Sequence, residues 1–244
     1  MTFHVLTIFP DMIEAATNYS ILQRAKKSGI VRINAIDIRR FAENKHGQID
    51  DAPYGGGAGM VMMAKPARDA YLHAGASPAS PVVYLSPSGK VFDQGLAREM
   101  SLLPEITLLC GHYEGLDQRA IDEFVTHEIS VGDFVLTGGE VAALVVIDAV
   151  SRLLPGAIGK EESHVNESFS EGLCGLLEHP HYTRPQVCFG REVPEVLLSG
   201  HHEKIRLWRK EMALKKTLEA RPELLAGLSE PTAGAQNPRF FSTM

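Results

Sequence analysis

Hydrophobic positions in the first 156 residues form short apolar blocks that alternate with amphipathic stretches. The blocks at 4–9, 31–38, 81–89, 105–115 and 127–139 predict strands, and the last three pass into turns. Within the last block, 134–136 (FVL) is itself strand-like. The stretches 10–27, 66–75, 92–101, 116–124 and 140–154 have helical spacing. This alternation predicts an α/β domain whose mostly parallel sheet is covered on both faces.

The pattern changes after Gly156. Residues 157–172 are polar and aperiodic, which is typical of a linker. The chain beyond is predicted to form a small helical unit, whose best helix (HEKIRLWRKEMALKKTLEA) places Trp208 on an apolar face. We therefore expect an α/β domain at 1–156, a linker at 157–172 and a helical domain at 173–244 that ends in a loose tail.

Composition adds limits on function. The chain is 44% hydrophobic and 22% charged, without an apolar run long enough to span a membrane, and we identify no signal peptide. Three cysteines without a CxxC pair favour reduced thiols in a cytoplasmic protein. The net charge of −6 speaks weakly against nucleic acid, yet residues 201–221 hold seven basic and three acidic residues. Charge distribution thus leaves RNA binding open.

The last three strands end in glycine-bearing turns, YLSPSG (84–89), LLCGHYEG (108–115) and VLTGGE (135–140). Ligands bind beyond the carboxyl ends of the strands in an open parallel sheet, and glycine lets main chain approach them closely. Glycines also simply end strands, so one such turn alone would say little. The phosphate motifs fail: YGGGAGM (54–60) lacks the last glycine of GxGxxG, and Gly89-Lys90 is followed by valine. A purine held by main-chain groups remains open.

Seven segments in order resemble the bacterial tRNA (guanine-37-N1)-methyltransferase family. They are DDAPYGGGAGMVM (50–62), YLSPSG, LLCGHYEGLDQR, SVGDFVLTGGE, DAVSRLLPG (148–156), HPHYTRP (179–185) and VPEVLLSGHH (193–202). The resemblance implies a deep trefoil knot of the SPOUT type at the C-terminal end of the α/β domain. It also implies S-adenosylmethionine as the cofactor, a Mg²⁺ requirement, a homodimer with shared active sites, and tRNA as the partner, with neither DNA nor a membrane.

The resemblance assigns the three turns to the cofactor. Glu114 would lie near the sulfonium, whose positive charge a carboxylate favours. The implied cofactor-binding residues are Tyr84, Leu85, Ser86, Pro87, Gly89, Leu109, Gly111, Tyr113, Glu114, Ser130, Val131, Gly132, Asp133, Phe134, Val135, Leu136, Gly138 and Gly139.

Methylation of guanine N1 requires a base for its proton and a donor at O6. The resemblance implies that Arg152 donates a hydrogen bond to O6 and that Glu167 is the general base. Glu167 stands where the family pattern Asp-Ser-Phe has aspartate. Glutamate performs the same proton chemistry, and the spacing of fifteen residues from Arg152 is kept. Without the resemblance, Arg152 would only oppose a helix dipole and Glu167 would be solvated.

Substrate contacts are implied for the glycine-rich loop at 50–62, for Ser168 in the linker, for HPHYTRP and for the basic helix that follows. The glycine-rich loop could equally be an ordinary turn. The histidine pairs His179/His181 and His201/His202 lack a zinc spacing with cysteine, so we interpret these histidines as structural or surface residues. No metal ligands are assigned. The implied substrate-binding residues are Asp50, Tyr54, Gly55, Gly57, Ser168, His181, Arg184, Arg206 and Arg209.

Three alternatives remain beside this enzyme. One is a knotted methyltransferase for another RNA position, and another is a homodimer that binds tRNA and cofactor without catalysis. A metabolic nucleotide-binding enzyme is more distant, because both phosphate motifs fail. We also predict that the 157–172 segment folds over the target only when tRNA is bound.

Overall fold

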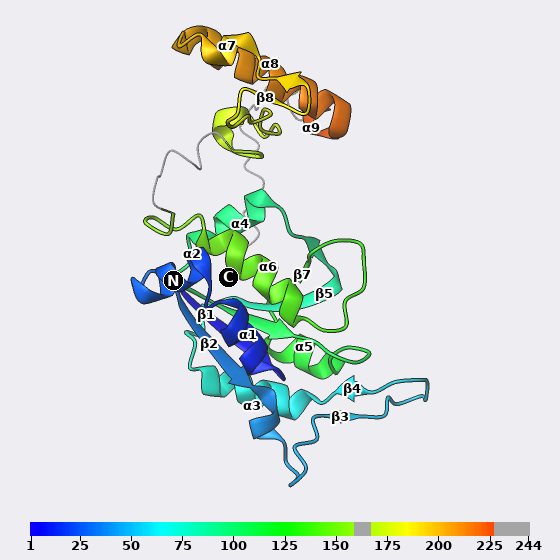
Figure 1. Ribbon diagram of the computed structural model, residues 1–244. Helices are drawn as coiled ribbons and strands as arrows, with labels where there is room; N and C mark the ends of the chain where they lie inside the picture. The colour runs from blue at the N-terminus through cyan, green and yellow to red at the C-terminus, as the bar shows by residue number, and fades with distance from the viewer. Residues whose placement is uncertain (159–166, 227–244) are drawn as a thin grey trace. The chain divides into compact units, whose positions relative to one another are not determined.

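A parallel five-stranded sheet organises the first part of the chain (Figure 1). The computed structural model describes residues 1–158 and 167–226, which fall into two compact units with the first range in one and the second in the other. The sheet order is β2-β1-β6-β5-β7, and every neighbouring pair is parallel. The predicted mostly parallel α/β fold is therefore confirmed. The strands are β1 Thr2–Thr7, β2 Arg32–Asp37, β5 Val82–Val91, β6 Glu105–Cys110 and β7 His127–Ser130.

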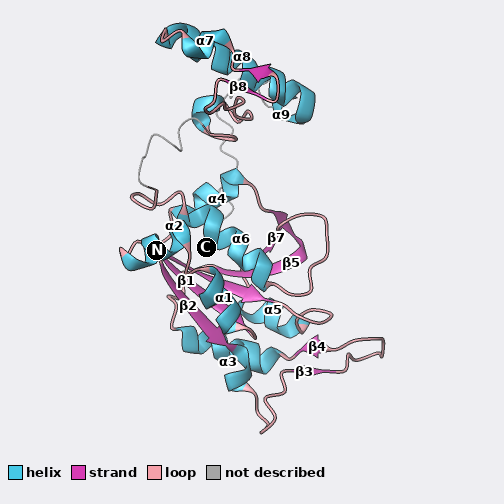
Figure 2. Cartoon of the chain, in the orientation of Figure 1, coloured by secondary structure: helices cyan, strands magenta, loops and turns pink. Residues whose placement is uncertain are grey.

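Helices cover both faces of this sheet, and each face has its own core (Figure 2). Buried side chains of α1 (Pro10–Ala16), α2 (Ser20–Lys27), α4 (Gln94–Ser101) and α6 (Glu140–Ser151) form one cluster with the strands. The second cluster is formed by buried side chains of the strands and of α3 (Ala64–Ala74), α5 (Gln118–Phe124) and the 3₁₀ turn η1 (Ile38–Phe41).

Helix α6 is the most apolar helix of the first unit, and its sequence explains its position. In EVAALVVIDAVS, Ala143, Val146, Ile147 and Val150 have no exposed surface. Each fully buried valine or isoleucine stabilises the fold by about 1.5–3 kcal/mol. The helix therefore anchors the chain against the sheet directly after the VLTGGE turn.

Three local predictions were wrong. The helix expected over 10–27 is two helices, because the hydroxyl of Thr17 bonds back to the carbonyl of Ile13 (2.8 Å) and Ser20 has φ +49°. The run 134–136 is not a strand: β7 ends at Ser130, and Val135 is 87% exposed. Strand β5 continues through the expected turn at PSG, with a register shift between Leu85 and Lys90. Gly29, just after α2, has φ +72°, the left-handed conformation that favours glycine at the end of a helix.

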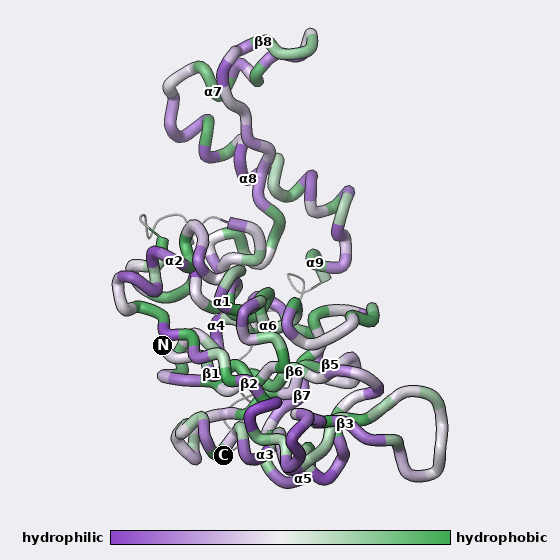
Figure 3. Tube along the Cα trace, turned by 60° about the horizontal axis from the view of Figure 1, so that its bottom comes forward, coloured by the Kyte–Doolittle hydropathy of each residue, from purple (hydrophilic) through white to green (hydrophobic). Residues whose placement is uncertain are grey.

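The second unit holds short elements around one long helix. That helix, α8 (His202–Ala220), matches the predicted segment residue for residue; its alternation of polar and apolar residues can be followed in Figure 3, and it buries Ala213 and Thr217. An unpredicted hairpin also forms. The other elements are η3 Glu171–Leu173, β8 Val187–Cys188, β9 Arg191–Glu192, α7 Glu195–Leu198 and α9 Glu223–Ala226.

Parts of two sequence predictions lie outside the described residues, namely the tail at 229–244 and positions 159–166 of the linker. Among the residues that are described, no helix combines the length and the apolar character needed to cross a membrane.

Candidate functional site

A pocket of about 300 Å³ opens where β6 and β7 end, beside the register shift of β5. Because these strands are parallel and adjacent in the order β6-β5-β7, residues Tyr84–Pro87 of β5 and the turns that follow β6 and β7 meet at one edge of the sheet. All of the predicted cofactor-binding residues line this pocket except Gly89, Leu109 and Asp133. The lining also includes His112 and Thr137, which belong to the assigned turns without being named as cofactor-binding residues, and Ala142, which lies outside those turns.

The three exceptions have separate causes. Leu109 is fully buried in the core, and Asp133 is exposed. Gly89 lies against the main chain of β7, where an added Cβ would come within 2.3 Å of the nitrogen of Ile129. Its missing side chain therefore lets two strands pack, and the structure does not bring it into the pocket.

The VLTGGE turn brings the chain from the edge strand β7 back to the end of β6. There the N–H of Gly139 donates to the carbonyl of Gly111 (2.9 Å), and Gly138 bridges to His112. A Cβ on Gly139 would lie 2.6 Å from the Cα of Cys110. Gly139 has φ −78°, so the constraint is close approach of two backbones and not a left-handed conformation.

A buried carboxylate closes this corner of the pocket. Glu140, the first residue of α6, is 2% exposed; it accepts a bond from the hydroxyl of Thr7 (2.6 Å) and lies 2.6 Å from Nε2 of His112. The helix N-terminus adds a favourable partial positive charge. Burial, followed by the charge of Glu140, raises the pKa of the Cys110 thiol well above its ordinary value. The acid flanking the glycines is thus a structural link between β1, β6 and α6.

The predicted glycine-rich loop is the tip of an antiparallel hairpin formed by β3 (Asp50–Asp51) and β4 (Val61–Met62). The N–H of Glu114 donates to the carbonyl of Met60 (2.9 Å), and Gly59 is so close to the Glu114 side chain that a Cβ would overlap it. The hairpin is therefore joined by main-chain bonds to the turn that carries Glu114.

The tip of this hairpin faces open space. Tyr54 is fully exposed, and no atom lies within 4 Å of a Cβ built on Gly55 or Gly57. Asp50, at the base, is partly exposed and pairs with Met62. These four predicted substrate residues are brought together on one hairpin whose backbone reaches the pocket.

The family model for tRNA (guanine-1)-methyltransferase TrmD matches residues 1–227. The chain belongs to this family. A tRNA (guanine-N(1)-)-methyltransferase of Caldicellulosiruptor saccharolyticus is 55% identical over 225 residues, which are 92% of this chain and 90% of the relative. A protein of the same name from Clostridioides difficile is 50% identical over 229 residues, 92% of this chain and 97% of its own. The family and the methyltransferase class predicted from the seven segments are confirmed.

Membership in a methyltransferase family implies S-adenosylmethionine as the methyl donor. The two residues expected to act on guanine belong to different units. Arg152 follows the last residue of α6, and its N–H donates to the carbonyl of Asp148 (3.1 Å). Glu167 opens a turn in the second unit, where its carbonyl accepts from the N–H of Ser170 (3.1 Å). Within the same turn, Ser168 accepts a bond from the N–H of Glu178 (2.9 Å).

A second pocket in this TrmD-family chain lies within the second unit. It is lined by His181, Arg184 and Arg209, three of the predicted substrate residues, together with apolar side chains such as Leu197. Arg206 is not part of this lining; both ends of its guanidinium contact the carboxylate of Glu203 (2.5 and 3.0 Å). Its charge is therefore already balanced on the helix surface.

We expect Gly139→Ala to lower the free energy of unfolding by about 1–3 kcal/mol, because the added methyl group meets main chain that cannot rotate away. Chemical denaturation measures this. Gly95→Ala is the matched control, since its Cβ meets only the carboxylate of Asp93 at 3.2 Å within helix α4, and we expect a change below about 1 kcal/mol there. Equal stability of both variants would contradict the close approach.

Glu140→Ala removes the acceptor of Thr7 and the partner of His112. Each polar group left without its partner costs about 1–3 kcal/mol, so the variant should unfold at clearly lower denaturant concentration. Asp69→Ala, which removes the exposed ion pair with Lys65 (2.9 Å), should cost less than about 1 kcal/mol. A loss no larger than that of the control would show that the buried bonds do not stabilise the fold.

Proposed function

We propose that the chain transfers a methyl group from S-adenosylmethionine to N1 of guanine 37 in the tRNA anticodon loop. The observation that carries this proposal is the pocket beside β5 at the ends of β6 and β7, lined by residues of the three segments that the family resemblance assigns to the cofactor. The family supplies the reaction class. Position 37 follows from the sequence resemblance and is what the experiment below tests.

The pocket fits S-adenosylmethionine. Its walls at Gly111, Gly138 and Gly139 are main chain, and a Cβ at any of them would collide with neighbouring atoms at 2.1–2.8 Å. Such walls offer N–H and C=O groups to a neutral purine, which agrees with the failure of the phosphate motifs. When bound, the cofactor supplies an electrophilic methyl group on a sulfonium. Glu114 at the pocket favours that positive charge over the neutral product.

The remaining chemistry concerns the guanine. In this proposal Glu167 accepts the N1 proton, and Arg152 donates to O6 as negative charge grows there. The target base leaves its stack, which costs least in a single-stranded anticodon loop. The hairpin of Tyr54 and Gly55 contacts RNA at the pocket, and Ser168 belongs to the same turn as Glu167.

The trefoil knot is part of the proposal. The return of the chain from β7 to the main chain at Gly111 supports it, because α6 then begins beside β6 and not beside the strand that precedes it in sequence. Gly89, packed on Ile129, holds the β5–α4 connection near the same edge. Knots are otherwise nearly absent from folds, so the proposal relies on family membership for this feature.

A homodimer with shared active sites is also proposed. Neighbouring helices α1 and α6 expose apolar side chains: Met12 is 41% exposed, Val141 and Val145 are 45% exposed, and Phe9, next to α1, is 48% exposed. Exposed apolar side chains on neighbouring helices support an interface at this surface. In a twofold dimer, the same patch serves both subunits. Arg152 of one subunit would then act with Glu167 of the other.

In this proposal the second unit binds the tRNA. Arg184 and Arg209 lie together at its pocket, where their charges can neutralise phosphates, and the excess of basic residues on α8 explains how an acidic chain handles RNA. The cytoplasm, where tRNA is modified, is the proposed place of action. No ligands and no step are assigned to Mg²⁺, whose requirement rests on the family resemblance alone.

The reaction is tested with methyl-labelled S-adenosylmethionine and two tRNA transcripts, one with guanine and one with adenine at position 37. We expect 1-methylguanine in the first alone. Glu167→Gln should lose transfer by about 10²–10⁴-fold, the usual contribution of a general base, while Glu167→Asp keeps most of it. Both variants should still bind cofactor and tRNA.

Near-normal transfer by Glu167→Gln would remove Glu167 from the proton step. Binding of both ligands without label in either transcript would identify a non-catalytic module. Label at another nucleotide would identify a knotted methyltransferase with a different target.

The dimer proposal has its own test. Val145→Glu places a charge on the exposed apolar surface of α6, and we expect the molecular mass in sedimentation to fall from that of a dimer towards that of a monomer. Leu72→Glu is the control, because Leu72 is 58% exposed on α3, which packs in the other core. Equal sedimentation of both variants would place the interface elsewhere.

A further inference from the structure

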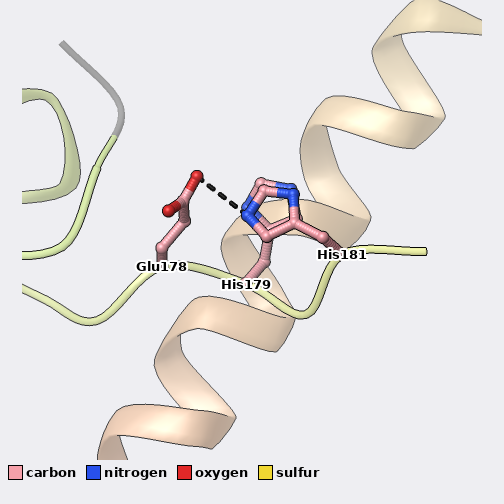
Figure 4. A group of neighbouring side chains, drawn as sticks. All are labelled: Glu178, His179 and His181. Atoms are coloured by element: carbon pink, nitrogen blue, oxygen red, sulfur yellow. Dashed lines mark ion pairs between the residues drawn. The ribbon is translucent and has the colours of Figure 1, made fainter. Parts of the chain in front are cut away.

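Three side chains that can bind a metal ion converge in the second unit (Figure 4). They are Glu178, His179 and His181, and their donor atoms all lie within 4.8 Å of one another. Glu178 and His181 already form an ion pair of 3.0 Å, and the two imidazole rings lie 4.6 Å apart between centroids. None of the roles proposed above uses His179 or the carboxylate of Glu178.

The local sequence explains this convergence. Pro180, between the two histidines, fixes its own backbone φ and restricts His179 to extended conformations. Side chains two residues apart in an extended segment point to the same side. The two imidazoles are therefore arranged in advance, and Glu178 completes the group from the preceding position.

We propose that Glu178, His179 and His181 bind a divalent transition-metal ion of the zinc class. Two imidazoles and one carboxylate form a common set for such ions, and this set leaves a fourth position open. Mg²⁺ is disfavoured because it prefers oxygen ligands. This site is therefore distinct from any magnesium requirement of methyl transfer.

The distances suit coordination after small side-chain rotations. Zinc–nitrogen bonds of about 2.0–2.1 Å place two tetrahedral ligands about 3.3 Å apart. The His181 side chain is 65% exposed and that of Glu178 is 32% exposed, so both can rotate to shorten the present separations. His179 is held more firmly, with its ring 6.4 Å from that of Trp208.

The charged groups near this site have opposite effects on the binding of a cation. Burial, and then the nearby His181 and Arg209, lower the pKa of His179. The positive charge of Arg209 also repels a cation, while Glu178 attracts one. The site adjoins the pocket of Arg184 and Arg209, so an ion with an open position would face the surface proposed for RNA.

The sequence around His179 and His181 lacks the cysteines of a common zinc spacing, so these histidines are first interpreted as structural or surface residues. The pattern that indicates a metal site is His-x-His directly after a glutamate. No cysteine is needed for a three-ligand site with an open position.

Trp208, the only tryptophan of the chain, provides the experiment with a reporter next to the site. The metal-free protein is titrated with Ni²⁺ while Trp208 fluorescence is followed, and Zn²⁺ is then added in competition. We expect saturable quenching at one Ni²⁺ per chain, reversal by Zn²⁺, and no reversal by Mg²⁺.

His181→Ala should weaken Ni²⁺ and Zn²⁺ binding by at least about tenfold, since even partners outside the coordination sphere contribute 10–100-fold. His202→Ala, which removes an exposed histidine at the start of α8, is the matched control and should leave both affinities unchanged. Circular dichroism checks that both variants fold. Because His181 is largely exposed, its removal should not alter the spectrum.

Quenching of equal strength and affinity in His181→Ala and the wild type would overturn the proposal. So would the absence of saturable quenching, or the failure of Zn²⁺ to compete. Neither tRNA nor S-adenosylmethionine is present in this titration, so its result is independent of the proposed methyl transfer.

Discussion

The contact between the backbones of Gly139 and Gly111 is the constraint on which the first unit depends. Their hydrogen bond ties the segment after β7 to the end of β6, across the position of β5. Only residues without Cβ permit this approach, since a methyl group on Gly139 would reach the Cα of Cys110. Because α6 starts at the next residue, the same contact fixes the helix that fills one of the two cores. One close approach thus determines both the pocket wall and much of the packing.

Glu140 stabilises this arrangement and has no role in the proposed methyl transfer. Both of its carboxylate oxygens have partners, one on β1 and one in the turn after β6. A buried charge that is paired and bonded holds its surroundings in one geometry, whereas the same charge unpaired would be costly. The two groups proposed to act on guanine, Arg152 and Glu167, belong to separate units. The cofactor side is built into a rigid core, while the chemistry of the base is supplied from two parts of the chain.

Much of the fold follows from the sequence because alternating strands and helices leave few alternatives to a parallel sheet. The three glycine turns also indicated the pocket, since parallel strands end at the same edge. The hydrogen bonds of Glu140 could not be predicted from the sequence, because Thr7 is 133 residues away and no local pattern pairs the two residues. The strand expected at 134–136 failed because apolar side chains can line a pocket or an exposed loop as well as a core. Likewise, the break in the 10–27 helix coincides with the back-bonded hydroxyl of Thr17 and the positive φ of Ser20, neither of which hydrophobic periodicity predicts.

The hairpin of β3 and β4 shares its hydrogen bonds with the turn that carries Glu114. Its tip is open to solvent on one side, and its base is bonded beside the pocket on the other. A macromolecule that immobilises the tip therefore also restricts Glu114, and a small ligand that orders Glu114 stiffens the tip. By thermodynamic linkage the two effects are equal in free energy. Binding of RNA at the tip and of cofactor beside Glu114, as proposed above, would then be cooperative, with these main-chain hydrogen bonds connecting the two sites.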